Sequence, residues 1–234
     1  MLTRSGVKHL QYLLSLRSRQ KKLDLFWELM KPGSGELVLN LGATPPHVGR
    51  ALTGEQSDAC IEQPEQDPRW ESLRVIGLNI SHENTRQYLE FYQRADRVAL
   101  TADGCCLPFT DKSFDIVFSN AVMEHISSEL QRRMASEIMR VGRSWFITTP
   151  NFWFPVEMHH RIPLFQFLPQ PVQRAIQVCF HTWPESETIY LLSARRFQSL
   201  FPGSKLLKVR VTFWPESLLV FHCDSRNQSG AWSA

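Results

Sequence analysis

Apolar residues recur along this chain in short runs that alternate with stretches of helical periodicity. A first helical region is expected over about 7–30, and Pro32, Gly33 and Gly35 end it. Short apolar runs then predict five buried strands, at Glu36–Leu41, Arg74–Ile80, Arg97–Leu100, Phe114–Ser119 and Ser144–Thr149. Helices are expected between several of them, one capped by Ser81 and one over Ala121–Val141. This alternation predicts parallel βαβ units with right-handed crossovers.

The pattern changes in the last third of the chain. Ile189–Phe201 is expected to be helical, and two strands follow at Leu206–Trp214 and Ser217–Cys223, joined by a tight connection at Pro215-Glu216. Such a hairpin adds antiparallel strands to a parallel sheet. The predicted fold class is α/β, a doubly wound, mostly parallel seven-stranded sheet with a C-terminal antiparallel hairpin. Residues 224–234 are polar and small and are expected to be a flexible tail.

A segment rich in aromatic residues and proline separates the fifth strand from the last helix. It spans 150–187, and a short helix is expected within it at Pro171–Phe180. Because it follows the carboxyl end of a strand, it is well placed to act as a lid or an acceptor-binding insertion.

Length and charge narrow the class of protein. The 234 residues suit one domain, 1–234, with an N-terminal helical region over 1–31. The net charge of +3 is too small to argue for nucleic acid. Residues 1–22 carry six basic residues and no acid, which indicates either a solvated helix face or a surface for anionic lipid or an anionic partner.

Cysteine content bears on the compartment. The five cysteines are odd in number and lack CxxC spacing, so neither a disulfide framework nor a zinc site is expected. A cytoplasmic location is the simplest expectation. No apolar run approaches the length needed to span a bilayer.

Candidate chemistry lies directly after the predicted strands, because ligands of open parallel sheets bind outside the carboxyl ends of the strands. Gly42 permits a tight turn and a close approach of backbone to ligand. The amide of Asn79 can bind ribose hydroxyls, and the carboxylate of Asp103 can accept from an adenine amino group. Asn120 follows the fourth strand. Each of these residues lies at or just after the end of a different predicted strand, at the spacing of βαβ units. This ordered occurrence is stronger evidence for a ligand site than any one of the residues alone.

The run from Ala102 to Ile126 carries a specific resemblance. Its sequence, ADGCCLPFTDKSFDIVFSNAVMEHI, resembles class I S-adenosylmethionine-dependent methyltransferases of the type 11 group, which carry a D-x-x-x-L-P-F-x-D-x-S-F-D-x-V-x-S pattern followed by E-H. The resemblance extends over roughly 20–150, and it implies a Rossmann-like fold and S-adenosylmethionine as cofactor.

The resemblance also implies a role for each matching position. Asn40, Gly42, Ala43 and Thr44 belong to the first motif, which wraps the methionine part of the cofactor. Asn79 takes the ribose hydroxyls, and Ile80 packs on the adenine. Asp103 binds the adenine amino group beside Gly104 and Cys105, while Asn120 and Ala121 lie near the sulfonium.

Three departures from the family pattern bear on affinity. The family usually has an acid where Asn40 and Asn79 stand, and a second glycine where Thr44 stands, here followed by Pro45-Pro46. A charge-assisted hydrogen bond contributes about 1.5–3 kcal/mol and a neutral one about 0.5–1.5 kcal/mol. Asparagine at the ribose position therefore costs roughly 1 kcal/mol, or about fivefold in affinity.

Methyl transfer needs a general base only when the acceptor must lose a proton. Glu157 and His159 are the first candidates, because they follow the fifth strand near the expected acceptor mouth; the alternative is that both fix the loop by hydrogen bonds. His125 is a second candidate, although in this family Glu124-His125 opens a helix. No metal site is expected, since adjacent histidines such as His159 and His160 rarely share an ion.

The leading hypothesis is therefore methyl transfer to a small-molecule or lipid/glycan-linked acceptor. An amphiphilic acceptor, with peripheral contact to an anionic membrane through residues 1–22, fits the basic N-terminal helix and the aromatic insertion. A non-catalytic, methyltransferase-like binding protein with a degenerate cofactor site is the main alternative. Nucleic acid is not expected as a partner, because no Asp/Asn-Pro-Pro-Tyr motif follows the fourth strand.

Overall fold

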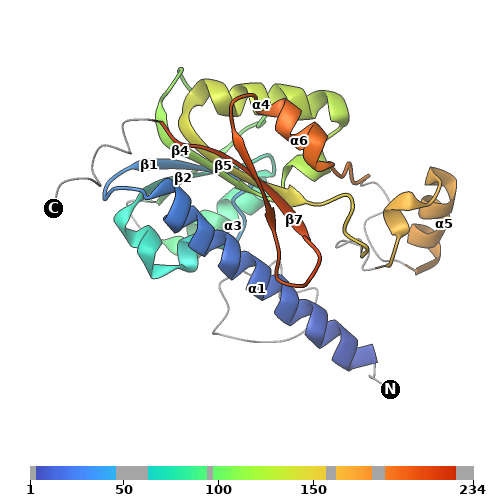
Figure 1. Cartoon of the computed structure of the whole chain (residues 1–234). Helices are drawn as coiled ribbons and strands as arrows, with labels where there is room; N and C mark the ends of the chain where they lie inside the picture. The colour runs from blue at the N-terminus through green and yellow to red at the C-terminus, as the bar shows by residue number, and fades with distance from the viewer. Residues whose placement is uncertain (1–3, 46–62, 94–96, 157–161, 181–187, 225–234) are drawn as a thin grey trace.

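A seven-stranded sheet forms the centre of the molecule, with helices on both faces (Figure 1). The computed structural model describes residues 4–45, 63–93, 97–156, 162–180 and 188–224. The strands are β1 (Leu37–Leu41), β2 (Arg74–Asn79), β3 (Arg97–Thr101), β4 (Phe114–Asn120), β5 (Gly142–Pro150), β6 (Lys205–Val209) and β7 (Ser217–His222). Their order is β3-β2-β1-β4-β5-β7-β6. Strands β1 to β5 pair in parallel, and β7 is antiparallel to both β5 and β6. The predicted fold class is confirmed.

Helices and short 3-10 turns connect the strands. The α-helices are α1 (Arg4–Met30), α3 (His82–Tyr92), α4 (Ser128–Val141), α5 (Gln170–Phe180) and α6 (Ala194–Leu200). The 3-10 turns are η1 (Pro64–Gln66), η2 (Pro68–Ser72), η3 (Met123–His125) and η4 (Phe165–Phe167). Within the described ranges, no helix is both long and apolar enough to cross a bilayer.

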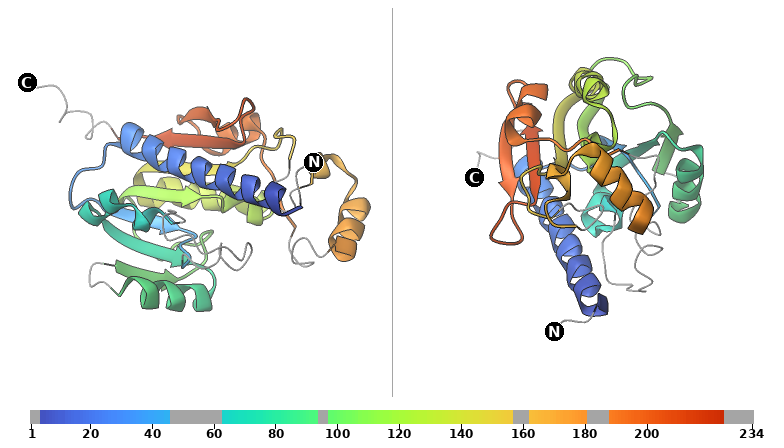
Figure 2. Two further views of the ribbon diagram at one scale, coloured as in Figure 1. Left: turned by 90° about the horizontal axis from the view of Figure 1, so that it is seen from below. Right: turned by 90° about the vertical axis from the view of Figure 1, so that its right-hand side faces the viewer.

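Helix α1 covers one face of the sheet (Figure 2). Leu23, Phe26 and Met30 recur at helical spacing and are buried there. The ring of Phe26 stacks on Trp70 of η2 with centroids 5.1 Å apart, and it meets Phe118 of β4 edge-on at 5.5 Å. These aromatic contacts fix α1 across the central strands.

Helices α4 and α6 cover the opposite face. Met134, Ile138 and Val141 form the buried stripe of α4, and Phe197 of α6 packs into the same core. Ser127 caps α4 and Ser193 caps α6, each accepting a hydrogen bond from the amide three residues on. Both faces of the central strands are therefore buried, as a parallel sheet requires.

The chain reverses direction across the sheet between β1 and β4. Strands β2 and β3 are added on one side of β1, and β4 then pairs with its other side. This is the topological switch point at which doubly wound sheets bind ligands. The carboxyl ends of β1, β2 and β4 therefore define the candidate site.

Two predicted helices are shorter than expected. The helix expected over Ala121–Val141 begins only at Ser128, because Ala121 has a left-handed φ of 58° and η3 precedes the cap at Ser127. The helix expected over Ile189–Phe201 is α6 alone, which starts at its cap Ser193.

The terminal hairpin also differs from the expectation of a tight turn. Strand β6 ends at Val209, and residues 210–216 form a longer connection. The buried carboxylate of Glu216 organises this connection, because its Oε2 accepts from the backbone amide of Val211 at 2.9 Å and its Oε1 accepts from Ser18 Oγ at 3.2 Å. The tail expected over 224–234 lies, from residue 225 on, outside the described residues.

Candidate functional site

A left-handed turn at Gly42 follows β1. Gly42 has φ of +84°, and its amide and that of Ala43 both donate to the carbonyl of Leu78, at 2.8 and 3.1 Å. A Cβ added at Gly42 would lie 2.3 Å from Cγ2 of Val122. The turn therefore requires glycine both for its dihedral angle and for the close approach of Val122. Thr44 continues the turn, and its Oγ1 accepts from Gln63 Nε2 at 2.7 Å.

Asn79 joins the end of β2 to this turn. Its Nδ2 donates to the Ala43 carbonyl at 2.8 Å, and its Oδ1 accepts from the Ser81 amide at 2.8 Å. One amide N–H and one lone pair of this side chain remain available to a ligand. The next residue, Ile80, is a large apolar side chain that is 74% exposed. The end of β2 thus offers a polar group beside an uncovered apolar surface.

Asp103 lies in the turn after β3. Its Oδ1 accepts from the Cys105 amide at 2.8 Å, and its backbone carbonyl accepts from the Cys106 amide at 3.0 Å. This turn fixes the position of the exposed Asp103 carboxylate, which can still accept further hydrogen bonds. Burial, and then the charge of Asp103, raises the pKa of the Cys105 thiol to about 11, so Cys105 is a neutral thiol at pH 7. Gly104 between them packs near Met134.

Asn120 ends β4 and lies in a polar cluster. Its Oδ1 accepts from Thr148 Oγ1 of β5 at 2.7 Å and from Lys22 Nζ of α1 at 3.2 Å. Ala121 follows in the left-handed region, and its amide donates to the Thr148 carbonyl at 3.0 Å. Three elements therefore meet at the position that the resemblance implies for the sulfonium.

Lys22 is a functional candidate that the sequence analysis did not identify. Its side chain is buried, and desolvation lowers its pKa from 10.5 to about 8, assisted by the charge of Arg19 and opposed by Glu124 and Glu216. The available signal was its position: Lys22 directly precedes Leu23 and lies four residues before Phe26, at the border of the apolar stripe of α1. A lysine there projects toward the sheet instead of solvent.

A second buried polar cluster lies beneath β1. Asn40 is buried, and its Nδ2 donates to Oε1 of Glu65 in η1 at 2.5 Å, while Tyr88 Oη of α3 donates to the same oxygen at 2.9 Å. Oε2 of Glu65 is buried and has no hydrogen-bond partner in the described part of the chain. Burial raises the pKa of Glu65. Asn40 thus faces a carboxylate that the neighbouring turn supplies.

The structure brings many of the predicted cofactor-site residues to one edge of the sheet. The turn at Gly42, Ala43 and Thr44 adjoins Asn79, and Ala121 extends the chain beyond Asn120. The predicted base candidates Glu157 and His159 lie outside the described residues. Neither Glu124 nor His125 opens a helix as the resemblance implied, since both belong to η3, and Glu124 is buried with Oε2 accepting from Thr149 Oγ1 at 3.1 Å.

Metal ligands are not grouped in the part of the chain that the structure describes. No set of three or more His, Cys, Asp or Glu side chains is placed there to hold an ion. The four cysteines described there, at 105, 106, 179 and 223, are free thiols.

One segment of the chain matches a known protein family by sequence. Residues 62–144 match the family model described as a methyltransferase domain. Two uncharacterized proteins of Mycobacterium tuberculosis are each 45% identical to this chain over 58 residues, which is 24% of this chain. That match spans about a fifth, 20%, of the length of those curated relatives.

Solved structures share the fold over most of this chain at low sequence identity. The PH0226 protein from Pyrococcus horikoshii OT3 superposes with a TM-score of 0.58 at 18% identity, covering 88% of this chain and 89% of that one. Phosphoethanolamine N-methyltransferase 2 from Haemonchus contortus, solved in complex with S-adenosyl-L-methionine, gives a TM-score of 0.52 at 17% identity over 81% of this chain and 38% of that one. The fold is thus the Rossmann-like fold of methyltransferases, and the resemblance to the type 11 methyltransferase domain is confirmed over residues 62–144.

Proposed function

We propose that this protein transfers a methyl group from S-adenosylmethionine to a small-molecule or lipid/glycan-linked acceptor. The observation that carries the proposal is the polar tether between Asn79 and the Gly42 turn, with exposed Ile80 beside it. This arrangement stands at the switch point of a sheet whose residues 62–144 match a methyltransferase domain. On the basis of the cysteine content, we also propose that the protein acts in the cytoplasm.

The residues present fit the adenosine half of the cofactor. Ile80 offers an apolar platform for the adenine ring, and Asp103 keeps acceptor capacity for its amino group. Asn79 has one N–H and one lone pair left for the ribose hydroxyls. When bound, S-adenosylmethionine supplies an electrophilic methyl group on a sulfonium.

Lys22 is the described residue best suited to handle the acceptor's proton. With a pKa of about 8, a fraction of its amine is neutral near physiological pH and able to accept a proton. Its hydrogen bond to Asn120 holds the amine at the carboxyl end of β4. Glu157 and His159 remain proposed alternatives for the same role, on sequence grounds.

The first experiment is calorimetric titration of S-adenosylmethionine and S-adenosylhomocysteine into the wild type and Asp103→Ala. We expect micromolar binding that weakens at least tenfold in the variant, which loses the adenine acceptor. Asp111→Ala is the matched control, since it removes another exposed carboxylate, which pairs with Arg140 away from the proposed site. Equal affinity in wild type and Asp103→Ala would contradict the proposed site.

One observation favours the alternative of a non-catalytic binding protein. The amides of Gly42 and Ala43 are both engaged by Leu78, and Val122 closes against the glycine. These contacts leave little backbone free to cradle the methionine part. Absence of binding at millimolar S-adenosylmethionine would favour this alternative and leave the fold assignment intact.

A further inference from the structure

Large apolar side chains are exposed at the end of the molecule from which the insertion projects. Trp153 is 57% exposed, and Leu164, Phe167, Val172 and Val178 of the same insertion are also exposed. Helix α5 carries the last two and stands apart from the sheet in Figure 1 and in the left view of Figure 2. Exposed apolar groups gathered in this way mark interaction surfaces.

The connection between β6 and β7 contributes to the same end. Phe213 is 88% exposed and Trp214 is 42% exposed. A groove of about 370 Å³ separates this connection from the insertion, and Trp153, Phe213 and Trp214 all line it. On the insertion side, Trp153 and Phe167 lie 5.7 Å apart between ring centroids. The two aromatic segments therefore form one surface around the groove.

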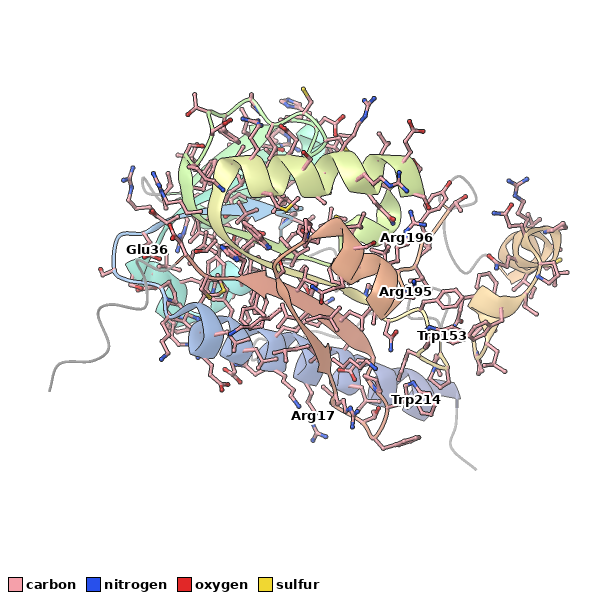
Figure 3. All side chains as sticks on the ribbon, turned by 45° about the horizontal axis from the view of Figure 1, so that its top comes forward. Arg17, Glu36, Trp153, Arg195, Arg196 and Trp214 are labelled. Atoms are coloured by element: carbon pink, nitrogen blue, oxygen red, sulfur yellow. The ribbon has the colours of Figure 1, made fainter. Side chains whose placement is uncertain are left out.

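Basic side chains border these aromatic rings. Lys208 and Arg210 are exposed and line the groove. Lys21 of α1 donates to the Arg210 carbonyl at 2.5 Å, and exposed Arg17 lies one helical turn before it. Figure 3 shows Arg17 on α1 and Trp214 on the β6–β7 connection, both at the lower edge of the molecule. The charges that α1, β6 and the β6–β7 connection present beside the groove are thus cationic.

The described residues of the insertion and of the chain that follows it carry no acidic side chain before Glu216, while Glu157, Glu185 and Glu187 lie outside the described residues. The ranges 162–180 and 188–215 contain no aspartate or glutamate, while they contain Arg174, Lys208 and Arg210 among other bases. The next acid, Glu216, is buried and engaged by Ser18 and Val211. The surface is therefore complementary to an anionic partner.

We propose that this surface docks on an anionic lipid bilayer. Phe213, Trp214 and Trp153 enter the boundary between headgroups and acyl chains, and the cations of α1, β6 and the β6–β7 connection contact lipid phosphates. Helix α5 of the same insertion adds the exposed Val172 and Val178 at this end of the molecule. An anionic bilayer matches both the aromatic and the basic residues of this surface, because its apolar acyl chains lie beneath a negatively charged headgroup layer.

The docking surface adjoins the candidate catalytic site. Asn151 lines the groove, three residues beyond Thr148, whose hydroxyl donates to Asn120. Three residues of extended chain span about 10 Å. A headgroup in the groove would therefore lie near the carboxyl end of β4, so the surface would select a lipid-borne acceptor; this last step rests on the proposed function.

Vesicle co-sedimentation tests the docking itself. We expect the protein to pellet with equimolar phosphatidylglycerol and phosphatidylcholine vesicles at 0.1 M NaCl, and to pellet far less with pure phosphatidylcholine or at 0.5 M NaCl. Phe213→Ser/Trp214→Ser should weaken binding at least tenfold. Lys208→Gln/Arg210→Gln should weaken it by about fivefold per cation and flatten its salt dependence. Val98→Ser and Arg132→Gln, exposed on β3 and α4, are matched controls that should bind as the wild type does.

Three results would overturn the proposal. The first is indifference to lipid charge, and the second is unchanged pelleting of both double variants. The third is a dimer in sedimentation velocity that Phe213→Ser/Trp214→Ser dissolves, because it would assign the surface to a second copy of the chain. The assay needs no cofactor, so its outcome is independent of the calorimetric test of the proposed function. Circular dichroism of each variant verifies folding.

Discussion

The side-chain amide of Asn79 is hydrogen bonded to the backbone carbonyl of Ala43 at a distance of 2.8 Å. The same side chain accepts from the Ser81 amide, so it links the first turn, the end of β2 and the start of α3. An aspartate has no N–H for the Ala43 carbonyl. The asparagine that departs from the family pattern therefore has a structural role in this chain.

Asn79→Asp should lower stability while changing cofactor affinity little. The variant places a carboxylate against the Ala43 carbonyl, which we expect to cost about 1–2 kcal/mol of unfolding free energy. It also offers the ribose a charge-assisted hydrogen bond, which offsets the distortion of the turn. Urea unfolding and calorimetry measure the two effects separately. Wild-type stability in Asn79→Asp would show that the tether contributes nothing.

Gly42→Ala should be among the more destabilising substitutions at the site. A left-handed φ costs alanine about 1–2 kcal/mol, and the added Cβ collides with Val122. The two penalties are separable because only the second depends on Val122. Gly42→Ala/Val122→Ala should recover the steric part, about 1–2 kcal/mol, in a double-mutant cycle of urea unfolding. Strict additivity of the two single substitutions would contradict the close contact.

Much of the architecture was predictable from the sequence, because binary pattern and turn residues act locally. The strand spans β1 to β5 and the cap at Ser81 were predicted to within about two residues, since each strand is a short, mainly apolar run. The prediction that all five are buried was wrong for β3, which lies at the edge of the sheet and leaves Val98 and Leu100 exposed. The helix predicted from Ala121 was too long, because apolar periodicity continues through η3 while Ala121 adopts a left-handed φ. Periodicity reports burial and carries no information on the dihedral angle of one residue.

The buried polar contacts of the site could not be predicted from the sequence. Asn40 and Glu65 are 25 residues apart, and Lys22 and Asn120 are 98 apart. No local pattern pairs such residues, since only the packing of α1 and η1 on the sheet brings them together. The sequence predicts weaker cofactor binding from the missing acid at position 40. In the structure, the Glu65 carboxyl group lies against Asn40 and accepts a hydrogen bond from its side-chain amide.

Glu65→Gln should abolish a pH dependence of stability. Burial raises the pKa of Glu65 above its ordinary value of 4.5, so the folded state holds a proton that the unfolded state releases. Wild-type stability should therefore fall relative to Glu65→Gln as the pH rises from about 4.5 through the raised pKa. Glutamine keeps an oxygen for Asn40 and Tyr88.

Urea unfolding of both proteins from pH 4 to pH 8 measures this difference. Glu28→Gln, which removes an exposed carboxylate of α1, is the matched control and should parallel the wild type throughout. A wild type that gains stability relative to Glu65→Gln with rising pH would contradict the assignment, because it would mean that folding favours the ionised carboxylate.

Lys22 is placed to report the charge of a bound cofactor. Its amine is hydrogen bonded to Asn120, and its pKa is about 8, so it is largely protonated at pH 7.5. The resemblance puts the sulfonium beside Asn120. A second positive charge there would disfavour the ammonium form and lower its pKa further.

Binding of S-adenosylmethionine should therefore release a fraction of a proton at pH 7.5, and binding of S-adenosylhomocysteine, which lacks the sulfonium charge, should release less. Calorimetry in phosphate and in Tris measures this release, because the apparent enthalpy then varies with the ionisation enthalpy of the buffer. Lys22→Met should abolish the difference between the two ligands. Lys21→Met, which removes the exposed neighbouring charge, should preserve it. Equal proton release by both ligands in the wild type would separate Lys22 from the sulfonium and would leave the buried amine with a structural role against Asn120.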